Sequence, residues 1–188
     1  MGASPLLLVD FDGVINFEAS LAVCAKNPDA FGYLRRENLT VDGMEVEVRW
    51  SGELVSRLNG LKREYGCEWK WLTTWLGDAV TQVDAVLKTE SDGHIPWDTD
   101  AGIPTDASVD EIVAERTARK CARLVDLVQD APRPFVWIDD QAIHKTLPPD
   151  CPGVGDVPHL TVAPDPKFGL LRPDVDQIAE FLSGLRPA

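Results

Sequence analysis

Residues 5–13 carry the sequence PLLLVDFDG, a continuous apolar run that ends in two aspartates and a glycine. A strand that is buried on both faces has this uninterrupted apolar character, which is typical of parallel sheets. Because alternate residues of an extended chain point the same way, Asp10 and Asp12 can face one substrate. Gly13 lets the backbone turn sharply after them. The stretch therefore predicts a buried strand with acidic groups at its carboxyl end.

Further segments of the chain alternate between predicted strands and helices. The predicted strands cover residues 5–10, 44–50 after an Asp42-Gly43 turn, 68–73, 134–138 and 159–163. The predicted helices run from a Ser51 cap to Gly66, over about 77–88, from a Ser108–Glu111 capping box to about 129, and from about 174 to 185. Residues 89–107 are expected to form a loop with a short strand near 94–95. This alternation predicts an α/β fold with a parallel sheet, and no linker divides residues 1–188 into two domains.

The chain carries 18 Lys and Arg against 31 Asp and Glu, a net charge of −13. Non-specific binding to nucleic acid needs clustered cations, so this charge disfavours an extended nucleic-acid partner and an anionic membrane surface. The N-terminal apolar run at 6–9 is too short for a signal peptide or a membrane span. Four widely spaced cysteines form no C-x-x-C pair. We therefore expect a cytoplasmic protein with free thiols and no membrane contact.

Two acidic clusters follow apolar strands: Asp10 and Asp12 after the first, and Asp139 and Asp140 after the strand at 134–138. Ligands bind at the carboxyl ends of parallel strands, where side chains from different strands converge. Carboxylates held this close repel one another unless a cation neutralises them, and Mg²⁺ prefers such oxygen ligands together with a substrate phosphate. One carboxylate can then attack phosphorus while another handles the leaving-group proton. Either cluster taken alone also fits a turn or a helix cap.

Several segments resemble motifs of the haloacid dehalogenase-like (HAD) superfamily of phosphotransferases. Residues 7–14, LLVDFDGV, are similar to its motif I. WLTT at 71–74 is similar to motif II, and VWIDD at 136–140 is similar to the acidic motif IV. Lys120, which precedes Asp139 by 19 positions, fits the lysine of motif III.

The likeness extends from residue 5 to the C-terminal helix and leaves residues 14–50 unmatched. It implies a three-layer Rossmann-like parallel sheet with a small flap or insert at 14–50 and no full cap domain, since Thr73 follows Asp10 by only 63 positions. A narrower likeness to small HAD domains associated with RNA repair lies in the tryptophans of motif II, in WIDD and in DPKFGL at 165–170.

The resemblance also implies a mechanism and a set of site residues. Asp10 is the expected nucleophile, which forms an aspartyl-phosphate, and Asp12 protonates the leaving alcohol and then activates water. The expected phosphate ligands are Thr73 or its neighbour Thr74, and Lys120. Mg²⁺ is expected on the Asp10 carboxylate, the Asp12 backbone carbonyl and the Asp139 carboxylate, with Asp140 in support.

The long basic helix and the tryptophans allow more than one interpretation. Lys120 shares its helix with Arg116, Arg119 and Arg123, so a solvated basic face is an alternative to a catalytic lysine. Trp75 and Trp97 follow predicted strands and are candidates for walls of the site, whereas the tryptophans within the strands are expected in the core.

These observations predict a Mg²⁺-dependent phosphatase that acts on a phosphorylated small molecule or a terminal phosphate. A second interpretation is a phosphatase for nucleic-acid ends in repair, which requires a basic track such as Arg35, Arg36 and Arg49. A third is a non-catalytic HAD-like binding or regulatory module, although the retained aspartates argue against a decayed site. Dehalogenation is disfavoured because HAD dehalogenases lack an acid at the position of Asp12.

Overall fold

The centre of the protein is a four-stranded parallel sheet. The computed structural model describes residues 3–24, 26–27, 29, 32–41, 43–75, 77–97, 104, 106–141, 154–155 and 157–185. The strands are β1 (Leu6–Val9), β4 (Glu68–Trp71), β5 (Phe135–Ile138) and β6 (His159–Val162), in the spatial order β4-β1-β5-β6. Val9 pairs with Trp71 on one side and with Ile138 on the other. This register confirms the predicted parallel sheet and brings the segments that follow β1 and β5 side by side.

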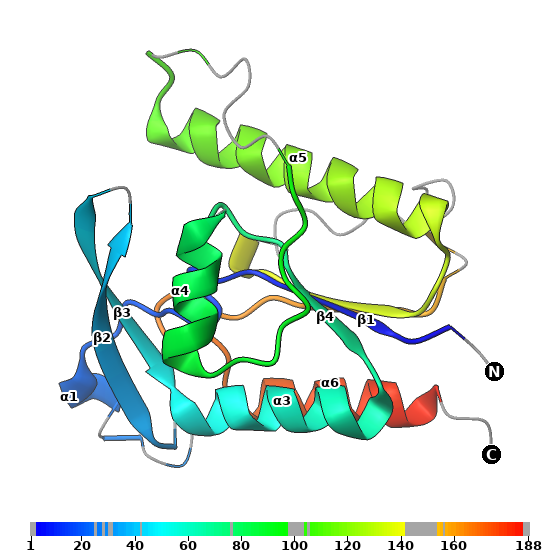
Figure 1. Ribbon diagram of the computed structural model, residues 1–188, viewed down its shortest axis with the longest axis horizontal. Coiled ribbons are helices and arrows are strands. Elements are labelled where there is room, and N and C mark those ends of the chain that lie inside the picture. Colours follow the sequence, from blue (N-terminus) through cyan, green and yellow to red (C-terminus); the bar gives the residue numbers. More distant parts are fainter. Residues whose placement is uncertain are drawn as a thin grey trace.

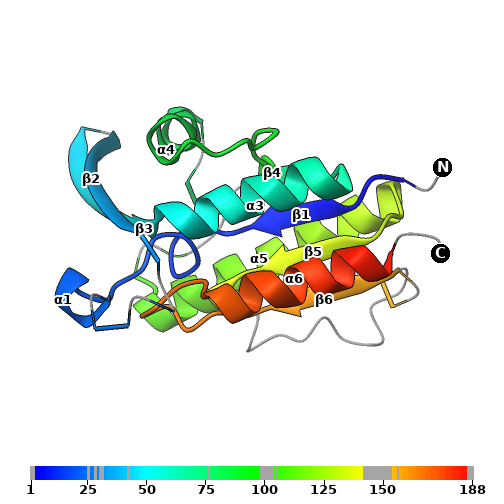
Figure 2. The same ribbon diagram turned by 90° about the horizontal axis from the view of Figure 1, so that it is seen from below.

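Helices cover both faces of this sheet, which explains why its inner strands are continuously apolar. Leu7 belongs to a buried cluster that includes residues of α3 (Gly52–Tyr65) and α6 (Arg172–Gly184). Leu8 points to the opposite face and belongs to a second cluster with residues of α5 (Val109–Asp130). Figures 1 and 2 show the resulting three layers, with α5 on one face of the sheet and α3 and α6 on the other. The predicted α/β architecture is therefore confirmed, and it is compatible with a Rossmann-like arrangement.

Local sequence signals set the ends of the helices. The Oγ of Ser51 accepts a backbone N–H of the first turn of α3 at 3.2 Å, and the helix ends at Gly66, whose φ of 64° is left-handed. Ser108 and Glu111 form the predicted capping box at the start of α5. The remaining predicted helix is α4 (Asp78–Leu87). All four predicted helices are present, with ends that agree to within about two residues.

A separate hairpin lies in the segment between β1 and α3. β2 (Leu34–Val41) pairs in antiparallel register with β3 (Met44–Ser51), and the two strands form a sheet of their own. β3 confirms the strand predicted from alternating residues, but β2 falls in a segment for which no regular structure is predicted. The reason is that only Leu39 of β2 is fully buried, so the strand has no apolar period. Asp42 of the predicted turn lies outside the described residues.

The hairpin stands at one end of the main sheet, next to the short helix α1 (Leu21–Cys24) (Figure 1). Its inner face packs against α4, since Leu39 and Val48 share the buried cluster that contains Val80 and Val83. Figure 2 shows that this is the end toward which the strands of the main sheet point. The hairpin therefore flanks the edge of the sheet where the acidic clusters are expected.

Three smaller expectations concern a short strand, the cysteines and membrane-spanning helices. The short strand expected near 94–95 is a single β-bridge between Trp71 and His94. Cys24 and Cys67 are free thiols as expected, and Cys151 lies outside the described residues. Within the described ranges, no helix combines the length and the apolar character that crossing a bilayer requires.

Candidate active site

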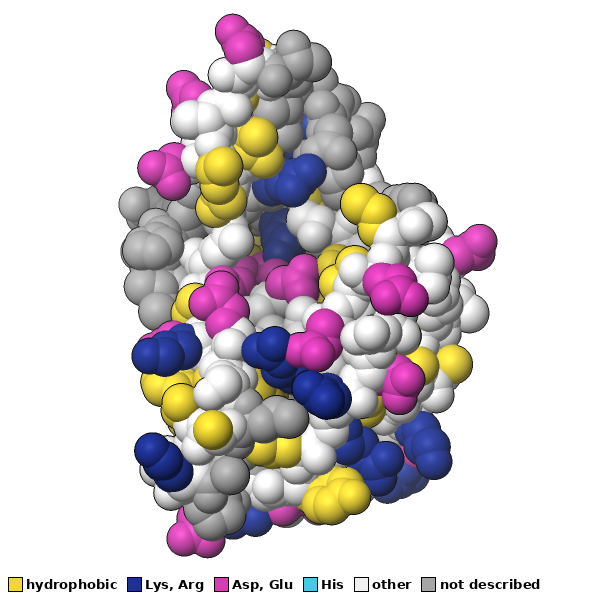
Figure 3. Space-filling view, turned by 90° about the vertical axis from the view of Figure 1, so that its left-hand side faces the viewer, with side chains coloured by type: hydrophobic (Ala, Val, Ile, Leu, Met, Phe, Trp, Pro, Cys, Tyr) yellow, Lys and Arg dark blue, Asp and Glu magenta, His cyan; other side chains and the backbone are white. Residues whose placement is uncertain are grey.

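The acidic clusters meet at the carboxyl end of the sheet. Asp10 follows β1 directly and Asp139 follows β5 directly, so the pairing of these two strands sets the two carboxylates next to each other. Asp140 joins them, and one carboxylate oxygen from each of the three residues lies within 4.8 Å of the others. Figure 3 shows acidic side chains gathered in a hollow near the centre of this face, with Lys and Arg side chains above and below.

Lys120 lies between two of these carboxylates. Helix α5 crosses the sheet so that the Nζ of Lys120 donates to Oδ2 of Asp10 and, at 3.0 Å, to Oδ2 of Asp139. Burial alone would lower the pKa of Lys120, but the charges of Asp10 and Asp139 raise it above its ordinary value, so the side chain stays protonated. Lys120 is only 3% exposed. The interpretation of a solvated basic face is therefore wrong at this position.

The remaining carboxyl groups show that the cluster carries more negative charge than Lys120 neutralises. Burial, followed by the charge of Asp10, raises the pKa of Asp139 to about 6, although Lys120 opposes the shift. Burial and the charges of Asp10 and Asp139 raise the pKa of Asp140 to about 7. One ammonium cannot neutralise three carboxylates, so a further cation would lower the electrostatic repulsion among them. Carboxylate oxygens are the donors that Mg²⁺ prefers. The donor set therefore fits the expected Mg²⁺ ion.

Gly13 allows Asp140 to approach the loop after β1. Its φ is 72°, a left-handed conformation that favours glycine. A Cβ at this position would lie 2.6 Å from Cγ of Asp140, which is closer than any real contact. The DxDG sequence therefore needs its glycine for two reasons, the turn of the backbone and the space for the third carboxylate.

Asp12 is placed differently from the other acids. Its side chain is not part of the group of three carboxylates and keeps contact with solvent. Oδ1 accepts a hydrogen bond from Nδ2 of Asn16 at 2.7 Å, and Oδ2 accepts one from Nε1 of Trp75 at 2.7 Å. Although the side chain reaches solvent, the protein around it partly desolvates the carboxyl group and so raises the pKa of Asp12, while the hydrogen bonds from Asn16 and Trp75 oppose the rise. A carboxyl group with a raised pKa that reaches solvent is chemically able to exchange a proton.

The two candidate threonines after β4 have different environments. Thr73 is 2% exposed; its Oγ1 accepts the backbone N–H of Trp75 at 3.3 Å, and its carbonyl accepts Nε1 of Trp97 at 2.9 Å. Thr74 instead lines the pocket that contains the carboxylates. Trp75 borders the site through Asp12, whereas Trp97 holds the backbone of Thr73 and packs in the core. Trp69, Trp71 and Trp137 are buried in the strands, as expected.

The pocket over the carboxylates has a volume of about 210 Å³. Its lining includes the acids Asp10, Asp12 and Asp140 and, in addition, Val113, Arg116 and Pro166. The sequence marks Arg116 only as a member of a basic helix face, but its position four residues before Lys120 places both on the same side of α5. Asn16 cannot be recognised from the sequence, because an asparagine in a loop carries no distinctive signal.

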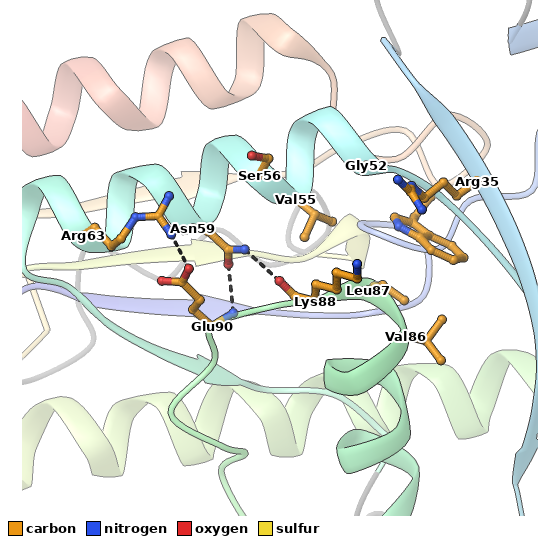
Figure 4. Close-up of a pocket in the computed structure, with 11 residues that line it drawn as sticks. Arg35, Gly52, Val55, Ser56, Asn59, Arg63, Val86, Leu87, Lys88 and Glu90 are labelled. Atoms are coloured by element: carbon orange, nitrogen blue, oxygen red, sulfur yellow. Dashed lines mark hydrogen bonds and ion pairs between the residues drawn. The ribbon is translucent and has the colours of Figure 1, made fainter.

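A second and larger pocket, of about 280 Å³, lies between the hairpin, α3 and α4. Figure 4 shows its lining: Arg63 pairs with Glu90, and the amide of Asn59 lies between the backbone of Lys88 and that of Glu90. The Asn59 side chain makes two hydrogen bonds: its Nδ2 donates to the Lys88 carbonyl at 2.8 Å, and its Oδ1 accepts the Glu90 N–H at 2.9 Å. Among the described residues that line it, Glu90 is the only acid, and it pairs with Arg63, so this pocket does not offer the convergent carboxylates of the first.

The arginines of the proposed basic track do not form one surface. Arg36 and Arg49 are cross-strand partners on one face of the hairpin, and both pair with Glu47, at 3.7 and 2.5 Å. Arg35 alternates to the other face, where it lines the second pocket together with Trp50. The guanidinium of Arg49 also donates to the carbonyl of Glu18 at 3.1 Å. The track is therefore split between two faces and partly neutralised.

Comparison with known proteins adds no relative: no protein-family model matches the chain, and no curated protein matches it.

Proposed function

We propose that the protein is a Mg²⁺-dependent phosphatase of the HAD type, which hydrolyses phosphate monoesters of small molecules. The observation that carries the proposal is the buried arrangement of Lys120 between Asp10 and Asp139, at the ends of adjacent strands, with Asp140 beside them. Burying two carboxylates and one ammonium, with a third carboxylate half buried beside them, carries a desolvation cost. A cluster with only a structural role gains little in return for this cost, which supports a catalytic use of these charges.

In this proposal each residue of the site has a defined task. An Asp10 oxygen attacks the phosphorus atom, the P–O bond to the leaving group breaks, and Asp12 gives its proton to the leaving oxygen. Water then attacks the aspartyl-phosphate, Asp12 takes up a proton from that water, and phosphate leaves. Lys120 balances charge on Asp10, and Thr74, with Thr73 behind it, supplies a hydroxyl near the phosphoryl oxygens. Asp10, Asp139 and Asp140 would hold Mg²⁺, which supplies neutralising charge to the transferring phosphoryl group.

The hairpin at 34–51 serves in this proposal as the small flap of the insert at 14–50. Asn16 accepts the backbone N–H of Arg49 at 2.9 Å and so connects β3 to the loop that carries Asp12. The pocket volume of about 210 Å³ suits a phosphate with a small organic group. A role at nucleic-acid ends loses its support because Arg36 and Arg49 both pair with Glu47.

The test is hydrolysis of an aryl phosphate and of a panel of small phosphate monoesters, with Mg²⁺ and with EDTA. Wild-type protein should be active only with Mg²⁺, and Asp10→Asn should lower the rate by at least about a thousandfold. Asp126→Asn is the matched control, because it makes the same change at an exposed position of α5. Equal rates for wild type and Asp10→Asn, or no hydrolysis of any ester, would refute the proposal.

A further inference from the structure

Both oxygens of the Asp12 carboxylate accept hydrogen bonds from other side chains, one in the same loop and one in the loop after β4. Nδ2 of Asn16 donates to Oδ1 at 2.7 Å, and Nε1 of Trp75 donates to Oδ2 at 2.7 Å. Asn16 belongs to the loop after β1, and Trp75 belongs to the loop after β4. Two donors on opposite sides fix both side-chain torsions of Asp12, which a single hydrogen bond would not do.

The indole of Trp75 is fixed by its own packing. Its ring lies edge-on against Phe11, with centroids 4.7 Å apart and planes at 67°, and Phe11 in turn packs edge-on against Trp71 of β4. The backbone N–H of Trp75 donates to Oγ1 of Thr73 at 3.3 Å. This packing against core residues fixes the indole ring and therefore the direction in which its N–H donates to Asp12.

The amide of Asn16 is fixed in the same way. Its Oδ1 accepts the backbone N–H of Arg49 at 2.9 Å, so its NH₂ group must face Asp12. Its backbone is held as well, because its N–H donates to the Phe11 carbonyl at 2.9 Å and its carbonyl accepts the Gly13 N–H at 2.7 Å. The hairpin is thus linked to Asp12 by two hydrogen bonds of Asn16, one to the Arg49 backbone and one to the Asp12 carboxylate.

We propose that Asn16 and Trp75 are positioning residues that hold the carboxyl group of Asp12 toward the oxygen of the leaving group. This inference rests on the proposed function. A carboxylate has about four acceptor positions, and the two donors use one on each oxygen. The remaining positions serve the pocket that Asp12 lines. Fixing a general acid in its reactive orientation accelerates proton transfer, because the side chain loses no further conformational entropy on the way to the transition state.

This role differs in its consequences from a merely structural one. Protonation of the leaving group matters most for alkyl esters, whose alkoxides are poor leaving groups, and least for p-nitrophenyl phosphate, whose phenolate leaves readily. A misplaced Asp12 should therefore slow alkyl esters selectively. Damage to the pocket as a whole would slow both kinds of ester by the same factor.

The experiment compares kcat/KM of Trp75→Phe on an alkyl monophosphate and on p-nitrophenyl phosphate, both with Mg²⁺. Phe keeps an aromatic ring against Phe11, is smaller than the indole and has no N–H donor for Asp12. We expect a loss of about tenfold to a hundredfold on the alkyl ester and of less than about threefold on the aryl ester. Asn16→Ala should show the same selectivity, which makes the test independent of either single variant.

Trp69→Phe is the matched control, because the buried Nε1 of Trp69 has no hydrogen-bond partner among the described residues. Its ratio of alkyl to aryl rates should equal that of wild type. An equal loss on both esters, or no loss, in Trp75→Phe and Asn16→Ala overturns the positioning role while leaving the phosphatase intact. Wild-type protein that hydrolyses neither ester overturns the proposed function and, with it, this inference.

Discussion

Replacing Lys120 by methionine should reveal how strongly the candidate site depends on this buried cation. Methionine reproduces the unbranched apolar stem of lysine as far as Cε but lacks the charged Nζ. The substitution leaves Asp10 and Asp139 without the ammonium that bridges them. It should therefore destabilise the metal-free protein far more than the loss of a surface ion pair would.

The magnitude follows from burial. The side chains of Lys120 and Asp139 are 4% and 0% exposed, and that of Asp10 is 7% exposed. Removing one partner of such a buried pair costs about 3–5 kcal/mol, because the remaining charge is left unpaired. Arg119 pairs with Glu115 on the same helix, but their side chains are 24% and 51% exposed. Arg119→Met should therefore cost less than about 1 kcal/mol.

Urea unfolding at pH 7.5, followed by circular dichroism, measures both variants with EDTA and with Mg²⁺. Mg²⁺ should stabilise Lys120→Met more than wild type, because the ion no longer competes with the ammonium for Asp10 and Asp139. A loss in EDTA as small as that of Arg119→Met would show that the buried bridge is not a dominant interaction. An unchanged response to Mg²⁺ would show that the ion does not share these carboxylates.

Three further predictions test neighbouring features. Burial raises the pKa of Asp139 to about 6 and that of Asp140 to about 7, so the native metal-free protein binds protons that the unfolded chain has released. Its melting temperature in EDTA should therefore fall as the pH rises from about 5 to about 7.5 and should recover with Mg²⁺; a rise in EDTA would contradict this. Gly13→Ala should destabilise the protein and abolish Mg²⁺ binding measured by calorimetry, because its Cβ collides with Asp140; unchanged binding would contradict the geometry. Lys88 has a φ of 60° at the end of α4, so Lys88→Gly should raise the free energy of unfolding in urea by about 1 kcal/mol, and a loss of stability would contradict the assigned strain.

The sequence predicts the strands that have continuous apolar runs and the helices that begin at a recognisable N-cap residue. The apolar runs before Asp10 and Asp139 identify β1 and β5, and Ser51 and Ser108 identify the starts of α3 and α5. Because strands of a parallel sheet end at a common edge, the meeting of the two acidic clusters could be predicted as well.

Other parts of the site depend on packing that no local pattern records. Lys120 lies near three arginines on its helix, and only the angle at which α5 crosses the sheet decides which cation is buried between Asp10 and Asp139. β2 is mostly exposed, so its sequence has no apolar alternation that would mark it as a strand. Asn16 acts through contacts with Arg49, which is 33 positions away, and such a contact is set by the hairpin rather than by the loop itself.

The strand order has a consequence for how the protein is made. Leu6 pairs with Glu68 and with Phe135, which follow it by 62 and 129 positions. At a synthesis rate of about 5–20 residues per second, β5 leaves the ribosome on the order of ten seconds after β1. During that interval the apolar run of β1 lacks one of its two neighbours and can associate with other chains or with a chaperone. The carboxylates that follow β1 and β5 cannot meet earlier, so the nascent protein acquires its acidic site only after β5 has been synthesised.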